Sequence, residues 1–224
     1  MNKKNYKFLT LITVFFVTVL LISNIVSTKI VDLGLFVFDA GTLLFPLSYI
    51  FADVLTEVYG YKETRKIIWM GFGSMILLSG IIILVGVLPP ASDRPFQADY
   101  QNVLGLTPRI VLASLFAYFV GEFSNSYIMA KVKIKMKGKQ LWVRTIGSTL
   151  VGEFFDTMIF VMIAFYGVFD NELLKTIIIS NYVFKVGVEV LFTPLTYLII
   201  NKLKKVEQED YYDYKTDFNP LKID

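Results

Sequence analysis

Ionisable and amide side chains recur at helical spacing inside the apolar stretches of this 224-residue chain. Asp53 and Glu57 are four residues apart, which places both carboxylates on one face of a helix. A charged group at the centre of a bilayer costs about 2.5–3.5 kcal/mol, so such groups usually face a polar interior, a partner or water. Three further sets also share one helix face each: Glu122 with Asn125 and Glu153 with Asp156 at a spacing of three residues, and Asn181 with Lys185 and Glu189 at a spacing of four.

Acids outnumber bases within these stretches. Lys185 lies among six carboxylates, those of Asp53, Glu57, Glu122, Glu153, Asp156 and Glu189. Burying this many anions is unfavourable unless protons or hydrogen-bond donors compensate them. Protons, a metal cation or a ligand with an N–H-rich edge would each serve. A guanine-like base fits the last description, because its ring N–H and its exocyclic amine can both donate to one carboxylate.

An alternative without a ligand is a polar network that satisfies itself. Lys185 would then pair with Glu189 one turn away or with Asp156 on another helix. The first acidic pair of the chain, which lies near the end of its helix, would face the basic residues Arg65 and Lys66.

Aromatic and amide side chains near the acids complete the candidate ligand site. Tyr49 and Tyr118 each precede an acid by one helical turn and could stack on a planar ligand. We assign no catalytic residue, no metal and no cofactor. The candidate substrate-binding residues are Asn24, Tyr49, Asp53, Glu57, Tyr118, Glu122, Asn125, Glu153, Asp156, Phe160, Asn181, Lys185 and Glu189.

Two absences and one basic stretch bear on other classes of function. The chain has no cysteine and no histidine, which removes thiolate nucleophiles, the imidazole base and the commonest zinc ligands. We therefore expect no enzyme. The lysines of residues 131–144 are typical of a short cytoplasmic loop between two membrane spans, so we expect no binding of nucleic acid.

Membrane-spanning helices are the elements that must position these residues. The sequence is 55% hydrophobic and 18% charged, too apolar for an ordinary soluble domain. About 20 apolar residues cross a bilayer as a helix, and residues 8–28 and 67–92 are uncharged runs of at least that length. Four more stretches carry the ionisable residues: 35–59, 110–130, 145–169 and 176–201. We predict an all-α, polytopic membrane protein with six transmembrane helices.

The distribution of lysine and arginine predicts how these helices are oriented. With both termini cytoplasmic, 17 of the 22 basic residues lie in inside segments and four in outside segments, as the positive-inside rule favours. No small-x-small cleavage site follows the first apolar run, so we interpret it as a retained span rather than a signal peptide. We predict a single transmembrane domain over residues 1–205 and a solvated cytoplasmic tail over residues 206–224.

A short similarity between the first and fourth spans suggests an internal repeat. The sequences SNIVSTK at residues 23–29 and SNSYIMAK at residues 124–131 both place Ser-Asn shortly before a lysine. These two spans would cross the membrane in opposite directions. The six spans would then form a 3+3 inverted repeat, with the ligand site at the interface of its halves.

Several ordered motifs resemble one known family. The run FDAGTLLFPLSYIFADVLTEVYGYKETRKIIWMGF covers residues 38–72, and the loop PPASDRPFQADYQNVLGLTPR covers residues 89–109. The stretches ASLFAYFVGEFSNSYIMAKVK at residues 113–133 and RTIGSTLVGEFFDTMIFVMIAFYG at residues 144–167 follow in the expected order. Over residues 24–201 the chain resembles the queuosine precursor transporter family, also described as vitamin uptake transporters.

The resemblance implies a bacterial inner-membrane importer of 7-deazaguanine precursors of the tRNA nucleoside queuosine. Its cargo would be 7-cyano- or 7-aminomethyl-7-deazaguanine, or queuine in some members. The family's D-x-x-x-E-V-Y-G segment corresponds to residues 53–60, and its Gly-Glu-x-x-Asp segment corresponds to residues 152–156. The expected partners are a small-molecule base and the lipid bilayer. Whether the chain forms a homo-oligomer is left open.

The source of energy for transport also stays open. The chain has no G-x-x-x-x-G-K-[ST] nucleotide-binding motif, so we expect facilitated or gradient-coupled transport. The alternatives are the substrate-binding subunit of a multi-component ATP-driven vitamin importer and a purine or vitamin proton symporter. A membrane scaffold whose polar interior is only structural is the alternative from another class.

Overall fold

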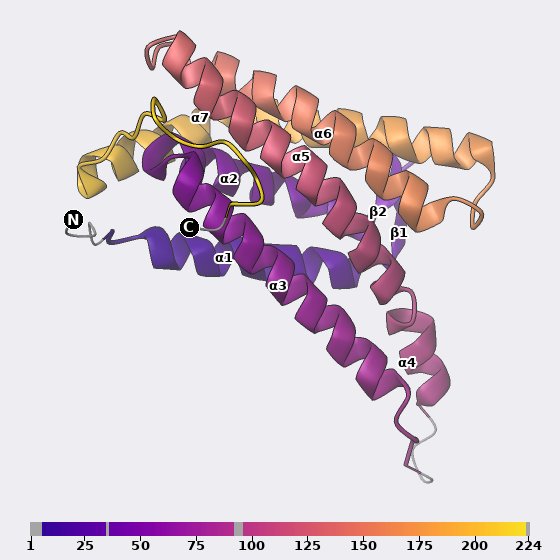
Figure 1. Cartoon of the computed structure of the whole chain (residues 1–224). Helices are drawn as coiled ribbons and strands as arrows, with labels where there is room; N and C mark the ends of the chain where they lie inside the picture. The colour runs from indigo at the N-terminus through magenta and orange to yellow at the C-terminus, as the bar shows by residue number, and fades with distance from the viewer. Residues whose placement is uncertain (1–5, 35, 92–95, 223–224) are drawn as a thin grey trace.

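Helices make up most of the chain, which the computed structural model describes over residues 6–34, 36–91 and 96–222. They pack into a bundle in which both ends of the chain lie near the same end of the bundle (Figure 1). In chain order the elements are α1 (Leu9–Val26), β1 (Ile30–Asp32), β2 (Val37–Asp39), the 3-10 helix η1 (Ala40–Leu43), α2 (Phe45–Tyr59), α3 (Tyr61–Gly86), α4 (Gln97–Leu104), α5 (Thr107–Lys135), α6 (Leu141–Phe165) and α7 (Asn171–Glu207).

The predicted second span is wrong in its first third. Residues 36–43 form strand β2 and the 3-10 helix η1 instead of a helix, and Leu35 lies outside the described residues. Strand β1 pairs with β2 in antiparallel register, with Val31 opposite Phe38. Gly34 permits the turn with a φ of 80°, and its N–H donates to the Asp32 carboxylate at 2.8 Å. This hairpin corrects the all-α prediction, and its turn chemistry explains why a helix does not start earlier.

Five of the described helices are long and apolar enough to cross a membrane: α1, α3, α5, α6 and α7. Helix α2 has 15 residues, which corresponds to about 22 Å at 1.5 Å per residue. It starts with Pro46 in its first turn, where a missing N–H is tolerated. The six-span count and the inverted repeat stay predictions, because a helix this short crosses a bilayer only together with the segment before it.

The other predicted spans coincide with helices whose bounds differ. Helix α3 starts at Tyr61, six residues before its apolar run, and ends at Gly86; Ser92, the predicted end, lies outside the described residues. Helix α7 extends the predicted span at both ends, and the Asp170 side chain caps it by accepting from the N–H of Glu172 and Leu173. Helix α4 lies in a region predicted as loop.

Helices α5 and α6 run side by side along much of their length (Figure 1). Two glycines allow this close approach. A Cβ atom on Gly121 would lie 2.8 Å from the Cβ of Asp156, and one on Gly152 would lie 2.9 Å from the Gly121 carbonyl oxygen. Both glycines lie one residue before an acid, so the contact also fixes where those acids lie.

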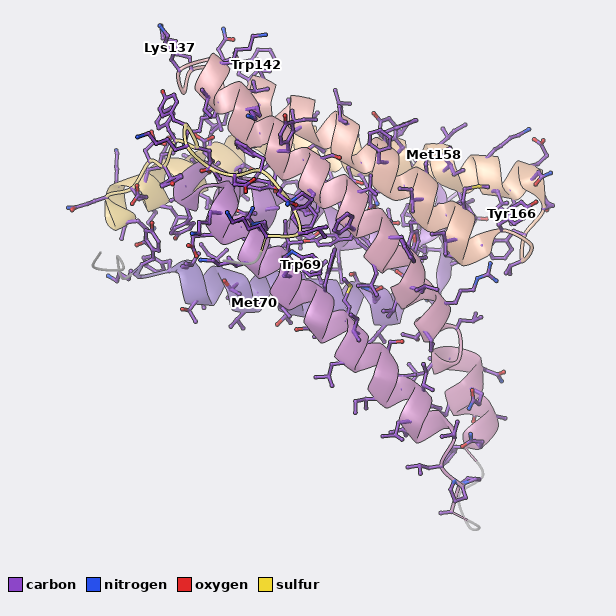
Figure 2. All side chains as sticks on the ribbon, viewed as in Figure 1. Trp69, Met70, Lys137, Trp142, Met158 and Tyr166 are labelled. Atoms are coloured by element: carbon purple, nitrogen blue, oxygen red, sulfur yellow. The ribbon has the colours of Figure 1, made fainter. Side chains whose placement is uncertain are left out.

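Apolar side chains cover the outside of the bundle while charged ones fill its interior. Leu77, Leu191 and Leu198 are 66%, 73% and 69% exposed. Met70 and Tyr166 project from the surface as well (Figure 2). This inverted distribution is what a lipid environment requires, because hydrocarbon rather than water meets the outer surface.

The C-terminal segment, residues 208–222, packs against the helices through some of its residues, while most of its residues are exposed. It passes in front of α3 (Figure 1). Arg65 donates to the Asp217 carbonyl at 2.8 Å, and the Trp69 indole donates to the Pro220 carbonyl at 2.9 Å. These donors at the start of α3 explain the packing, because the tail carbonyls satisfy them. Whether this end of the bundle is cytoplasmic stays a prediction.

Candidate functional site

Four helices bring their charged residues together in the middle of the bundle. We define the central acid cluster as Asp53 of α2, Glu122 of α5, Glu153 and Asp156 of α6, and Lys185 and Glu189 of α7. No member is more than 2% exposed. As the spacing predicted, Glu153 and Asp156 share the inward face of α6, and packing buries all six cluster residues; Glu57 and Asn181, which were predicted to share faces with cluster residues, contact other groups.

Lys185 is the buried cation of this cluster. Its Nζ donates to Asp156 Oδ2 at 2.7 Å and lies 3.1 Å from Glu153 Oε2. The Glu153 contact is an ion pair without hydrogen-bond geometry. The ammonium also lies 4.8 Å from the centre of the Phe45 ring. Of the two partners that the sequence left open, Asp156 is the one that pairs with Lys185.

The remaining acids of the cluster have few donors among the described residues. Asp53 Oδ1 accepts from the Asn125 amide at 2.8 Å, while its Oδ2 has no hydrogen-bond partner there. Within the described part of the chain, neither carboxylate oxygen of Glu122 or of Glu189 accepts a hydrogen bond. Glu122 also interacts electrostatically with Asp53, Glu153 and Asp156. The cluster therefore holds several acceptor atoms that a donor-rich ligand could engage.

Two tyrosines flank these acceptors. Tyr49 and Tyr118 are fully buried, and the structure gives neither hydroxyl a hydrogen-bond partner among the described residues. The Tyr49 ring passes close to the α5–α6 contact, since a Cβ on Gly152 would lie 3.1 Å from its Cε1. The Tyr118 ring packs against Phe16 and Phe72. Stacking of either ring on a ligand stays a prediction.

Two predicted site residues lie apart from the cluster. The Asn24 amide donates to the Leu20 carbonyl at 2.8 Å and contacts the Met75 sulfur at 3.4 Å. Phe160 belongs to an apolar group around Val161. The aromatic residue beside Lys185 is Phe45. The sequence analysis missed it because Phe45 lies on α2 and Lys185 on α7, far apart in the sequence.

Glu57 belongs to a second charged group at the end of the bundle where the chain ends meet. Its Oε1 lies 2.6 Å from Lys204 Nζ, 2.8 Å from Arg144 Nη2 and 3.4 Å from Lys133 Nζ. Asp210 of the C-terminal segment pairs with two of these cations, at 2.6 Å from Lys133 and 2.9 Å from Lys204. We call these five residues the Glu57 network. The expected pairing of the first acidic pair with Arg65 and Lys66 is wrong, because Lys66 pairs with Glu63 and Arg65 binds tail carbonyls.

Asn181 belongs to a third group at the opposite end, beside the hairpin. Asp39 accepts from the hydroxyl of Ser27 at 2.6 Å, from that of Thr42 at 2.9 Å and from the Asn181 amide at 3.4 Å. Thr42 also donates to the Asn181 oxygen at 3.3 Å. We call these four residues the Asp39 network. The sequence analysis missed Asp39, although a carboxylate in the apolar run FVFDAG was a signal for it.

Comparisons with known proteins place the sequence beside one group of transporters. The family described as "Putative vitamin uptake transporter" matches residues 39–199. A "Probable queuosine precursor transporter" of Bacillus subtilis (strain 168) is 31% identical over 176 residues, which cover 78% of this chain and 77% of that protein. The "Queuosine precursor transporter" of Escherichia coli (strain K12) is 25% identical over 212 residues, 90% of each chain.

A third relative is the "Probable queuosine precursor transporter" of Haemophilus influenzae (strain ATCC 51907 / DSM 11121 / KW20 / Rd). It is 26% identical over 168 residues, which cover 72% of this chain and 68% of that protein. No solved structure matches the chain significantly.

Proposed function

The chain belongs to the "Putative vitamin uptake transporter" family, and we propose that it imports 7-deazaguanine precursors of queuosine across the membrane. The family is one of transporters rather than enzymes, and the apolar helices make this a multi-pass membrane protein. The names of the three relatives support queuosine precursors as the cargo.

The observation that carries the proposal is the excess of unpartnered carboxylate oxygens in the central acid cluster. Five acids there share one cation, Lys185, and the oxygens of Glu122 and Glu189 accept nothing from the described chain. A deazaguanine presents a ring N–H beside an exocyclic amine, and this edge can donate two parallel hydrogen bonds to one carboxylate. Ligand binding would therefore compensate charges that the protein leaves uncompensated.

The cluster suggests a role for each of its residues. Lys185 holds Glu153 and Asp156 in place, which leaves Asp53, Glu122 and Glu189 as the acceptors for the ligand. Asn125 orients Asp53 through their hydrogen bond. Tyr49 and Tyr118 supply ring faces for stacking. Asn24, Glu57 and Asn181 contact other parts of the bundle, and Phe160 packs against Phe45 rather than against an acid, so we do not assign these four residues to the ligand.

Transport would proceed by exposing the cluster to each side of the membrane in turn. We propose six crossings with both termini in the cytoplasm, in which η1 and α2 together form the second crossing. Trapping of the cargo by metabolism or an ion gradient would drive net uptake, since the chain lacks a nucleotide-binding motif. If protons drive uptake, a carboxylate of the cluster is their carrier.

The test is uptake of radiolabelled 7-aminomethyl-7-deazaguanine in cells that lack their own importer. Asp156→Asn and Glu153→Gln should each reduce uptake at least about tenfold, since each removes a charge that fixes Lys185. Glu172→Gln, at a solvent-exposed position on the same bundle, is the control and should transport normally. Normal uptake by both cluster variants would remove these residues from the mechanism.

Four further measurements separate the alternatives. Competition among guanine, the cyano and aminomethyl deazaguanines and queuine would identify the preferred cargo. Copurification of an ATPase whose loss abolishes uptake would make the chain a binding subunit, while loss of uptake with a protonophore would favour a symporter. Without uptake and without thermal stabilisation by any deazaguanine, the chain would be a scaffold.

A further inference from the structure

Two buried polar networks flank the central acid cluster, and the proposed binding function uses neither of them. Along α7, Asn181 of the Asp39 network comes first, the cluster residues follow, and Lys204 of the Glu57 network comes last. Asn181 and Lys204 are about 35 Å apart at 1.5 Å per residue. The segment from η1 to α2 repeats this order with Thr42, Asp53 and Glu57. One network therefore lies on each side of the cluster.

The Asp39 network joins the end of α1, strand β2, η1 and α7 at one carboxylate. Its members are at most 1% exposed, and all of its donors are neutral. A cavity of about 60 Å³ borders it, and Ser27, which donates to Asp39, forms part of the cavity lining. A ligand that entered at the hairpin end would meet this network before it reached the cluster.

The Glu57 network joins α2, α5, α6, α7 and the C-terminal segment. Lys133, Arg144 and Lys204 all approach the same oxygen, Glu57 Oε1. Lys133 also donates to the Glu57 and Tyr211 carbonyls, at 2.6 and 2.7 Å. Side chains of four helices thus meet at one carboxylate at this end.

We propose that these networks are the two gates of the transporter: the Asp39 network closes the hairpin end and the Glu57 network closes the end where the chain termini lie. This inference rests on the proposed function, since a gate has meaning only where a ligand passes. A carboxylate shared by several helices is suited to gating, because the loss of its contacts frees all of those helices together. Both gates are closed in this structure, in which the cluster is buried.

The two gates differ in strength. Separating a buried ion pair leaves an uncompensated charge, which costs more free energy than separating a carboxylate from neutral hydroxyl and amide donors. The Asp39 gate has one charged partner and neutral donors, whereas every side chain of the Glu57 gate is charged. The hairpin end should therefore open more readily, and the resting transporter would expose the cluster on that side. With the termini in the cytoplasm, that side faces the cargo to be imported.

Single cysteines can report on each gate, because the chain has none of its own. Ser114→Cys lies on α5 between the hairpin end and Glu122, and Thr149→Cys lies on α6 between Arg144 and Glu153. Both positions are at most 2% exposed, and their hydroxyls have no hydrogen-bond partner in the described chain, so the substitutions break no such contact. The probe is a charged, membrane-impermeant methanethiosulfonate applied to the purified protein in detergent.

Asp39→Asn should raise the labelling rate of Ser114→Cys at least about tenfold and leave Thr149→Cys unchanged. Glu57→Gln should raise the labelling rate of Thr149→Cys by a similar factor and leave Ser114→Cys unchanged. Thr42→Val removes one donor from the Asp39 gate and should raise the labelling rate of Ser114→Cys by a smaller factor. Lys204→Gln removes one donor from the Glu57 gate and should do the same for Thr149→Cys. These two variants keep the test valid if a carboxylate variant fails to fold. Glu172→Gln should change neither rate. Equal effects on both reporters, or no effect, would overturn the gates.

The labelling requires no cargo, so it is independent of the proposed function. Selective labelling without uptake of any deazaguanine would leave the gates in place and reject the cargo. If the chain takes up a deazaguanine and Asp156→Asn reduces that uptake, but the gate variants do not change labelling selectively, the gates are rejected and the proposed function is retained.

Discussion

Glu57 and Glu122 are the same residue type and equally inaccessible, yet their surroundings are opposite. Glu57 lies among Lys133, Arg144 and Lys204, whereas both oxygens of Glu122 lack a partner in the described chain. A compensated buried charge contributes to stability through its partners, because removing it leaves cations unpaired. An uncompensated one costs stability and persists where function requires it. The contrast separates a part of the molecule where ion pairs join several helices from the part that we propose binds the ligand.

Replacement of Glu57 should have the largest effect on stability. Glu57→Gln removes the carboxylate that three cations approach: Lys133 and Lys204 keep Asp210, but Arg144 keeps no carboxylate partner among the described residues. Because a buried charge then loses its partner, we expect the free energy of unfolding to fall by about 3–5 kcal/mol. Denaturant or thermal unfolding in detergent measures this effect, with Glu172→Gln as the control. A loss below about 1 kcal/mol would show that the network does not hold the helices together.

Gly152→Ala tests whether the α5–α6 contact fixes the geometry of the central acid cluster. The added Cβ would lie 2.9 Å from the Gly121 carbonyl oxygen and 3.0 Å from the Asn125 Cβ, so the helices must separate. We expect a loss of about 1–3 kcal/mol together with reduced uptake. Gly147→Ala on the same helix meets nothing within 4 Å and should be neutral or stabilising, since alanine favours helix. Equal behaviour of the two variants would contradict the close contact.

Glu122→Gln tests whether the unpaired carboxylate of the central acid cluster serves binding rather than stability. The amide keeps the shape of the side chain and removes an anion from a group of like charges, so we expect stability to stay the same or rise by about 1 kcal/mol. Uptake of labelled deazaguanine should nevertheless fall at least about tenfold. If this variant lost as much stability as Glu57→Gln, the central acid cluster would be structural as well.

Asp210 should give the smallest effect, because its side chain is 44% exposed. Burial acts to raise the pKa of Asp210, but hydrogen bonds from Lys133 and Lys204 outweigh it and hold that pKa below its ordinary value of 3.8. A depressed pKa in the folded state means that the contribution is present above about pH 3.8 and is lost as the pH falls further. Asp210→Asn should therefore cost under about 1 kcal/mol at neutral pH. Unfolding measured from pH 7 to pH 3 should show the two proteins converging at the acidic end.

The sequence predicted the helices and the acidic faces because both depend on local spacing. Residues four apart share a helix face wherever the helix lies, and the cost of a charge in lipid turns that face inwards. The candidate residues of α5 and α6 other than Phe160 accordingly lie in or beside the central acid cluster. The hairpin was missed because the apolar run before Asp39 is compatible with either a strand or a helix.

The partners of the acids could not be predicted in the same way. Glu57 and Lys204 are 147 residues apart in sequence yet 2.6 Å apart in space, and the C-terminal segment brings Asp210 to the same place. The number of acids and bases in the sequence shows that buried carboxylates need compensating cations or donors, but it does not show which carboxylate is paired.

The sequence by itself determined that this chain is a bundle of lipid-exposed helices with an acidic interior, since periodicity and composition are properties of neighbouring residues. Only the tertiary structure decided which acids are paired, which lack a partner and which join the two flanking networks. The physical reason is that hydrogen bonds and ion pairs act over about 3 Å, and the packing of distant helices sets those distances.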